Sequence, residues 1–183
     1  MKTCLILIDI QNDYFAGGRM TLVGMEAAAT NALLLLQAYR RTGSRIIHVQ
    51  HVSMGPKATF FLPETHGVKG HDLVVPLEDE VLVTKNYPNG FRDTHLLEML
   101  NKENMTDLVF CGAMSHMCID ATVRAGFDLG FNCVVAEDAC ATRDLSFNDT
   151  IISASDVHAS FMAALSGTYA TVLSTEQVLQ TSL

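Results

Sequence analysis

Short apolar runs rich in β-branched residues recur along this 183-residue chain, and helical stretches separate them. Each run is almost continuously apolar, as a strand buried on both faces of a parallel sheet must be. The predicted strands are Cys4–Ile8, Arg45–Val49, Val81–Thr84, Leu108–Cys111, Asn132–Val135 and Tyr169–Val172. This alternation predicts an α/β fold: a three-layer α/β/α sandwich with a central, mostly parallel sheet of about six strands.

The segments between these runs carry helix signals, such as the stops at Gly43 and Gly130. The predicted helices are Met25–Arg41, Asp93–Lys102, His116–Leu129, Asn148–Leu165 and Ser174–Leu179. No shift in composition and no flexible linker interrupts the pattern, so we expect residues 1–183 to form one domain. The connector Ser53–Pro76 is unusually long and holds three of the four prolines, and long loops in compact domains are often functional.

Composition excludes several classes of function. The chain has 12 Lys and Arg against 20 Asp and Glu, a net charge of −8, whereas a nucleic-acid-binding surface is basic. Its longest apolar runs, such as Leu33–Leu36 and Met162–Leu165, are far shorter than the roughly 20 residues of a transmembrane helix. The five cysteines follow no disulfide framework, and we find no signal peptide. We therefore expect a cytoplasmic protein with reduced thiols that binds neither nucleic acid nor membrane.

Three chemically active side chains follow strands whose carboxyl ends meet at one edge of the predicted sheet. Asp9 follows the first strand, Lys85 the third, and Cys118 comes after the fourth, near the start of a helix. Ligands of parallel α/β sheets bind at this edge. A helix N-terminus and a nearby lysine favour the nucleophilic thiolate, and a carboxylate could accept the thiol proton. Each residue alone could instead be structural: a turn cap, a solvated charge and a small core residue. The shared sheet edge favours the catalytic interpretation.

Three sequence blocks resemble the signatures of the isochorismatase-like cysteine hydrolases, a family that includes nicotinamidases and N-carbamoylsarcosine amidases. The blocks are Leu5–Phe15, Lys85–Phe91 and Cys111–Ala125, and the likeness continues in order to Gly167–Ala170. The third block is the most specific, because a Cys-Gly pair ends a strand and Cys118 then opens a helix. The resemblance covers most of the chain.

The resemblance implies a catalytic triad of Asp9, Lys85 and Cys118. It also implies a cis peptide between Ala113 and Met114, and an oxyanion hole made by the backbone N–H groups of Met114 and Cys118. The implied reaction is hydrolysis of a C–N bond in a small amide or carbamoyl compound through a thioester on Cys118, with Asp9 moving the protons. Family members commonly assemble, so we expect a homo-oligomer, a dimer or a tetramer.

The sequence departs from the metal site of the nicotinamidases, in which an aspartate and histidines follow the second strand. His51 stands roughly where that aspartate would be, and His48, three residues earlier on a predicted strand, points to the opposite face. His66 and His71 complete the candidate ligand set. We expect no metal and no other cofactor, with His48 in the core or at a pocket edge and the other histidines in solvent.

Five aromatic residues near the same sheet edge are candidates for an apolar substrate pocket, with core packing as the alternative. They are Phe15, Phe60, Phe61, Tyr87 and Phe91. Two other functions stay open: a non-catalytic ligand-binding or redox-sensing module whose Cys118 is oxidised, and a flavodoxin-like cofactor binder. The acidic segment after the first strand disfavours the flavodoxin-like cofactor binder, because this segment would repel a phosphate.

Overall fold

The computed structural model describes residues 2–181. Its centre is a six-stranded sheet in the order β3–β2–β1–β4–β5–β8, and all five strand pairings are parallel. The strands are β1 (Thr3–Ile8), β2 (Arg45–His51), β3 (Val81–Lys85), β4 (Asp107–Ala113), β5 (Asn132–Ala141) and β8 (Thr171–Leu173). The predicted parallel sheet of about six strands is confirmed.

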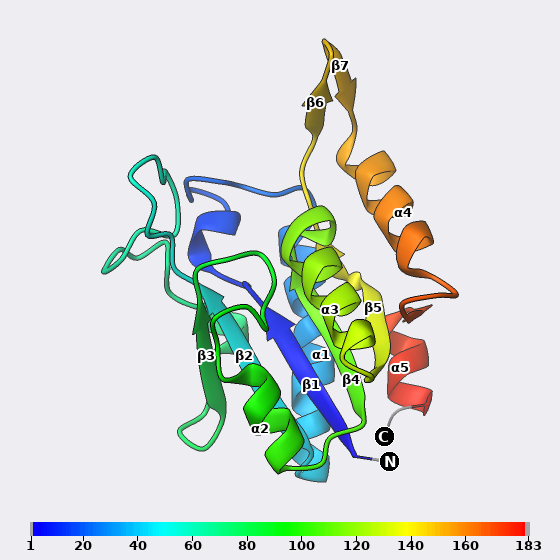
Figure 1. Ribbon diagram of the computed structural model, residues 1–183. Helices are drawn as coiled ribbons and strands as arrows, with labels where there is room; N and C mark the ends of the chain where they lie inside the picture. Colours follow the sequence, from blue (N-terminus) through cyan, green and yellow to red (C-terminus); the bar gives the residue numbers. More distant parts are fainter. Residues whose placement is uncertain (1, 182–183) are drawn as a thin grey trace.

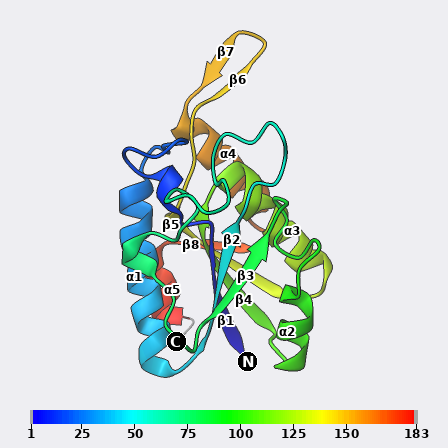
Figure 2. The same cartoon turned by 90° about the vertical axis from the view of Figure 1, so that its left-hand side faces the viewer.

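Helices cover both faces of this sheet (Figures 1 and 2). One layer contains α1 (Met25–Thr42) and α5 (Thr175–Thr181), and the other contains α2 (Leu96–Lys102), α3 (Asp120–Asp128) and α4 (Ala154–Leu165). Short turns of helix occur at Asn12–Tyr14, Asp72–Val74 and Ser115–Ile119. The sheet and these two helical layers form the three-layer sandwich predicted from the sequence. Among residues 2–181, none of the helices combines the length and the apolarity needed to cross a bilayer.

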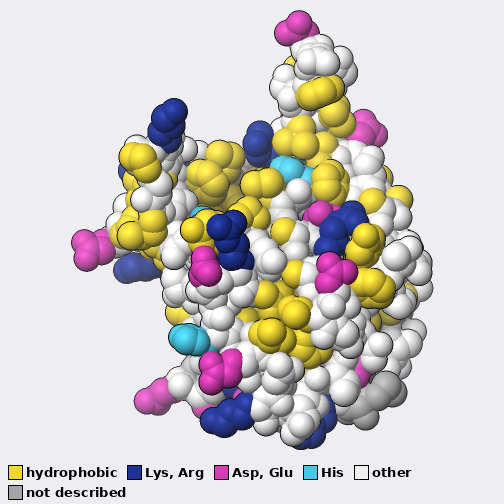
Figure 3. All heavy atoms as spheres, in the orientation of Figure 1, with side chains coloured by type: hydrophobic (Ala, Val, Ile, Leu, Met, Phe, Trp, Pro, Cys, Tyr) yellow, Lys and Arg dark blue, Asp and Glu magenta, His cyan; other side chains and the backbone are white. Residues whose placement is uncertain are grey.

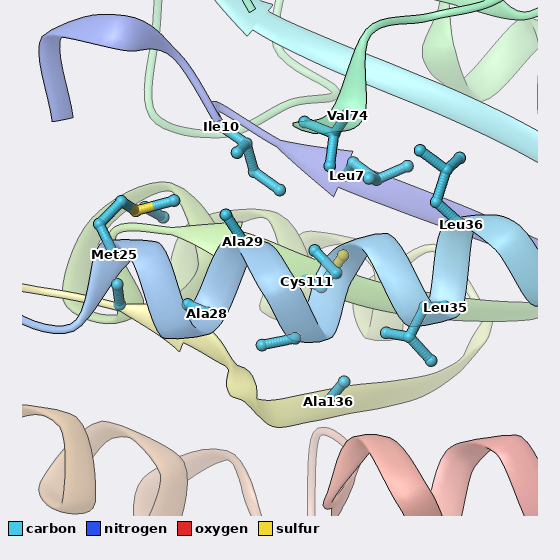
Figure 4. Packing of buried hydrophobic residues seen from close by; sticks show 14 of the residues in the cluster. Leu7, Ile10, Met25, Ala28, Ala29, Leu35, Leu36, Val74, Cys111 and Ala136 are labelled. Atoms are coloured by element: carbon cyan, nitrogen blue, oxygen red, sulfur yellow. The ribbon is translucent and has the colours of Figure 1, made fainter. Parts of the chain in front are cut away.

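Alternate residues of β1 enter two separate cores, because neighbouring side chains of a strand point to opposite faces. Leu5 and Leu7 belong to the core beneath α1, whereas Ile6 and Ile8 belong to the core beneath α2 and α3. Figure 4 shows the first core, in which small alanines of α1 face the strands. These alanines let the helix lie close to the sheet, and residues 4–8 of β1 are 0–2% exposed.

The segment before α4 differs from the prediction. The predicted helix Asn148–Leu165 is wrong in its first part, where β6 (Leu145–Phe147) and β7 (Thr150–Ile152) form an antiparallel hairpin that projects from the body (Figure 1). Asn148 and Asp149, at the tip, have φ values of 46° and 62°. Positive φ at both central residues is typical of a type I′ hairpin turn, so the Asn-Asp pair was the signal for it.

The strand order places the predicted reactive residues around one crevice. The chain builds the sheet outward from β1 through β2 and β3, then returns to the other side of β1 with β4. Ligands of parallel sheets bind where the direction of winding reverses, here between β1 and β4. Gly112 allows these strands to lie close at this point: its φ is +122°, and a Cβ there would collide with the carbonyl oxygen of Ile8.

Glu80, just before β3, is a nearly buried carboxylate with three hydrogen-bond donors. Burial raises its pKa, but Arg40 (2.7 Å), the Leu77 amide (3.0 Å) and His48 (2.9 Å) outweigh burial and lower the pKa to about 2. A carboxyl with a lowered pKa stabilises the fold above its ordinary pKa, and this contribution is lost as the pH falls toward the folded value.

We therefore expect the free energy of unfolding of the Glu80→Gln variant to be about 2 kcal/mol lower than that of the wild type at pH 7. The difference should shrink as the pH falls from about 4.5 to about 2, because the wild type then loses the same interaction. Urea unfolding at several pH values measures both effects. A difference that stays constant over this pH range would contradict the assignment.

Candidate active site

The structure brings together the three residues that the sequence predicted as a triad. The Nζ of Lys85 lies 2.7 Å from Oδ2 of Asp9 and 3.2 Å from Sγ of Cys118. The three residues are 0–6% exposed. An ammonium, a carboxyl and a sulfur thus share one buried site at the carboxyl edge of the sheet.

Each of these side chains is positioned by the end of a strand. Asp9 leaves β1 with a left-handed φ of 52°, and its amide donates to the carbonyl of Val49 (2.9 Å). Aspartate tolerates this conformation better than most residues do. Lys85 is the last residue of β3, and Cys118 lies in the π-helical turn Ser115–Ile119, which we call the cysteine turn. The turn joins β4 to α3 and holds the sulfur above the sheet edge.

Lys85 has three ammonium protons and three acceptors. In addition to Asp9 and Cys118, it lies 3.1 Å from Nδ1 of His51. Because an ammonium only donates, this nitrogen carries no proton and the neutral ring is protonated at Nε2. Burial and the charge of Lys85 lower the pKa of His51, which keeps the ring neutral.

The prediction that His51 lies in solvent is therefore wrong, because its ring contacts Lys85 in the site. The signal that sequence reasoning missed is its position at the end of the second strand. In the register of β2 and β3, His51 lies directly beside Lys85.

Opposing influences act on the protonation of the Cys118 sulfur. Burial raises the pKa of the Cys118 thiol, the carboxylate of Asp9 raises it further, and Lys85 offsets this only in part. Burial and Asp9 thus oppose the thiolate that the helix start and the lysine favour. Burial also lowers the pKa of Lys85, but Asp9 and Cys118 outweigh burial and leave it raised, so the lysine stays charged. Within the described chain, Oδ1 of Asp9 is buried without a hydrogen-bond partner, and it can accept the thiol proton.

A cis peptide bond between Ala113 and Met114 directly precedes the cysteine turn, at the position that the resemblance implies. The amides of Met117 (3.0 Å) and Ile119 (3.3 Å) both donate to the carbonyl oxygen of Met114. These bonds close the turn around Met114 and Cys118, the two residues expected to form an oxyanion hole. Both are at least 94% buried, which suits amides that must be fixed in advance.

Comparison with known proteins identifies the family. A model of the isochorismatase domain matches residues 3–177. The chain belongs to the isochorismatase family.

An isochorismatase family protein of Bacillus subtilis is 52% identical over 180 residues, covering 98% of this chain and all of that protein. The crystal structure of an isochorismatase-type hydrolase from Oleispira antarctica is similar, with a TM-score of 0.94 and 47% identity, covering 98% of this chain and 96% of that one. The ureidoacrylate amidohydrolase of Cronobacter sakazakii is 30% identical over 171 residues, covering 75% of this chain and 74% of its own. The resemblance found in the three sequence blocks is confirmed.

The histidines of this isochorismatase-family chain do not form the metal site considered from its sequence. Each has a different neighbour. His48 contacts Glu80, His51 contacts Lys85, His66 contacts Asn12, and His71 contacts Phe15. Within residues 2–181, the one group of potential ligands is Asp9, His51 and Cys118. Lys85 contacts all three through Nζ, so an ammonium already lies among them and these residues do not fit a metal ion.

Two of the five candidate pocket aromatics lie near His51. The ring of Phe61 is 6.1 Å from that of His51, and Phe60 packs on Phe61 at 4.9 Å. The amide of Phe61 donates to Oδ2 of Asp13 (2.6 Å), which ties the long connector to the segment after β1. Phe61 is completely buried in the core beneath α1, and Phe60 packs against that core.

The rings of the other three candidates contact other groups. Phe15 is buried and stacks on His71, with ring centroids 3.7 Å apart. Phe91 stacks on Phe131 and packs against the core beneath α3. Tyr87 is 36% exposed, and a guanidinium covers its ring. For Phe15 and Phe91 the structure favours the core-packing alternative.

Replacing His51 by alanine is expected to lower kcat about tenfold, because one proton of the Lys85 ammonium loses its acceptor. His51→Asn, which keeps an acceptor, should lose less. Steady-state kinetics on a hydrolysed amide measure kcat and KM separately, and the exposed His95→Ala serves as the control. Equal kcat for the wild type and His51→Ala would show that this contact has no role in turnover.

Proposed function

We propose that this isochorismatase-family protein is a cysteine-dependent hydrolase that cleaves the C–N bond of a small amide or carbamoyl compound through a thioester. The supporting observation is the Lys85 ammonium, bonded at once to the carboxylate of Asp9 and the sulfur of Cys118. The similarity to a ureidoacrylate amidohydrolase supports the same bond class. The substrate itself is left to experiment.

In the acylation step, the Cys118 sulfur attacks the substrate carbonyl carbon as its proton moves to Asp9. The negative charge on the carbonyl oxygen is stabilised by the backbone N–H groups of Met114 and Cys118. The tetrahedral intermediate then collapses, the C–N bond breaks, and Asp9 gives its proton to the leaving nitrogen. Ammonia or an amine departs, and the acyl group stays on sulfur.

In the deacylation step, water attacks the thioester carbonyl while Asp9 takes one of its protons. The C–S bond breaks, the acid product leaves, and the proton returns from Asp9 to the Cys118 sulfur. Lys85 keeps its charge throughout and compensates for the negative charge that moves between the two groups.

The test is a panel of nicotinamide, N-carbamoylglycine and 3-ureidopropionate, assayed for ammonia release with and without chelator. Mass spectrometry of quenched reactions then looks for an acyl adduct on Cys118. We expect turnover of at least one compound, the adduct, and no effect of the chelator. The redox alternative predicts oxidation of Cys118 by peroxide and no ammonia from any compound.

We also propose that the protein is a homo-oligomer. The hairpin of β6 and β7 exposes Phe147 (70%) and Ile151 (76%), and Figure 3 shows apolar side chains on this projection. An isolated two-stranded hairpin is marginally stable in water, which favours a packed environment for it. Light scattering of the wild type and of Phe147→Ser/Ile151→Ser measures the mass, and a monomeric wild type would overturn this proposal.

A further inference from the structure

A second chain of hydrogen-bonding side chains lies behind the cysteine turn and has no part in the mechanism above. Ser115 begins the turn, and its Oγ lies 2.8 Å from Nδ1 of His158 on α4. The other ring nitrogen, Nε2, lies 3.5 Å from a carboxylate oxygen of Glu137 on β5. The same Oγ lies 3.3 Å from the carbonyl oxygen of Ala141. A hydroxyl, an imidazole and a carboxylate are thus aligned across three elements.

A hydroxyl, an imidazole and a carboxylate in this order are typical of a serine nucleophile that is activated by a histidine base. Ser115, however, is not placed to attack a substrate. The residue is completely buried, and its hydroxyl contacts only His158 and the end of β5. A nucleophile must reach a substrate carbonyl, so direct catalysis is excluded. What Ser115 can do is hold the turn, because it lies between Met114 and Cys118.

The single hydroxyl proton of Ser115 can be donated to only one acceptor at a time. When His158 is neutral and protonated at Nε2, Ser115 donates to Nδ1. When both ring nitrogens are protonated, His158 donates to Ser115, which then donates to Ala141. Both arrangements link the turn to α4, and the second links it to β5 as well.

We propose that Ser115 and His158 are positioning residues for acyl transfer. They fix the cysteine turn against α4, so that the amides of Met114 and Cys118 point at the position of the carbonyl oxygen. Preorganised donors of this kind account for much of the barrier reduction, and a misplacement of about 1 Å can cost 10²-fold in rate. This inference rests on the proposed function, since it assigns a role within the same reaction.

The experiment measures acylation of Cys118 by p-nitrophenyl acetate, an activated acyl donor, in Ser115→Ala, His158→Ala and His158→Asn. The nitrophenolate burst of Cys118→Ala is subtracted as background. We expect Ser115→Ala and His158→Ala to acylate about tenfold more slowly at saturation, with KM changed less than about twofold. His158→Asn places an amide near the position of Nδ1 and should recover much of the rate.

A further measurement separates positioning from folding. Alkylation of Cys118 by iodoacetamide should proceed at the wild-type rate in every variant, since that reaction forms no oxyanion. The matched control is Ser160→Ala, an exposed serine on the same helix.

Wild-type acylation rates in all three variants would overturn the inference. So would slowed acylation that tracks a smaller folded fraction in thermal unfolding, or alkylation slowed to the same degree. If the wild type itself acylates no faster than Cys118→Ala, the proposed function fails and this inference fails with it. Normal wild-type acylation with unaffected variants leaves the proposed function intact.

Discussion

Replacing Cys118 by alanine is expected to lower kcat on a hydrolysed amide by at least about 10⁴-fold, because no acyl bond to sulfur can then form. Cys118→Ser should also be nearly inactive. A hydroxyl is far less acidic than a thiol, and the site already raises the pKa of the sulfur that it replaces. Both variants should fold, since the side chain is small and the replacements leave little empty volume.

The matched control is Cys133→Ala, which removes a buried thiol from the core beneath α3. We expect it to keep wild-type turnover and to lose a modest part of its stability. Initial rates of ammonia release measure turnover, and circular dichroism confirms folding. If Cys118→Ala turned over the amide as fast as Cys133→Ala, hydrolysis through a thioester would be wrong.

Asp9, Lys85 and Cys118 could be predicted together because parallel strands constrain where their ends lie. Once the first, third and fourth apolar runs are read as strands of one parallel sheet, their carboxyl ends must share an edge. The family blocks add which residue at each end the resemblance assigns to the triad. Neither argument requires knowledge of side-chain packing, and so both could be made from the amino-acid order alone.

The protonation of Cys118 and the place of His51 depend on quantities that the sequence does not display. A helix start and a lysine favour a thiolate, but the degree of burial decides the balance, and burial is set by the whole fold. His51 contacts Lys85 because β2 and β3 pair in one register, and a shift of one residue would turn it to the other face.

The link from Ser115 to His158 was unpredictable for another reason. The helix that carries His158 follows the hairpin of β6 and β7, and the sequence prediction merged the tip and the second strand of this hairpin with the helix. Only the packing of α4 against the cysteine turn brings these two side chains to 2.8 Å.

The triad should be as important for stability as for chemistry. Replacing Lys85 by methionine leaves the Asp9 carboxylate buried without its cation, and we expect the free energy of unfolding to fall by about 3–5 kcal/mol. Turnover should be lost as well, because no cation then compensates for the charge on Asp9 or sulfur. Urea unfolding and ammonia release measure the two effects, and the exposed Lys102→Met is the control.

The double variant Asp9→Asn/Lys85→Met separates these two roles. It removes both charges together, so it should recover most of the stability lost by Lys85→Met while remaining inactive. The coupling free energy between the two positions is then large and measurable from the double-mutant cycle. Additive losses of stability would mean that the two charges do not compensate each other in the folded state. A charge pair that is retained although an uncharged replacement folds well is best explained by the reaction, in which Asp9 has to gain and lose a proton beside a fixed cation.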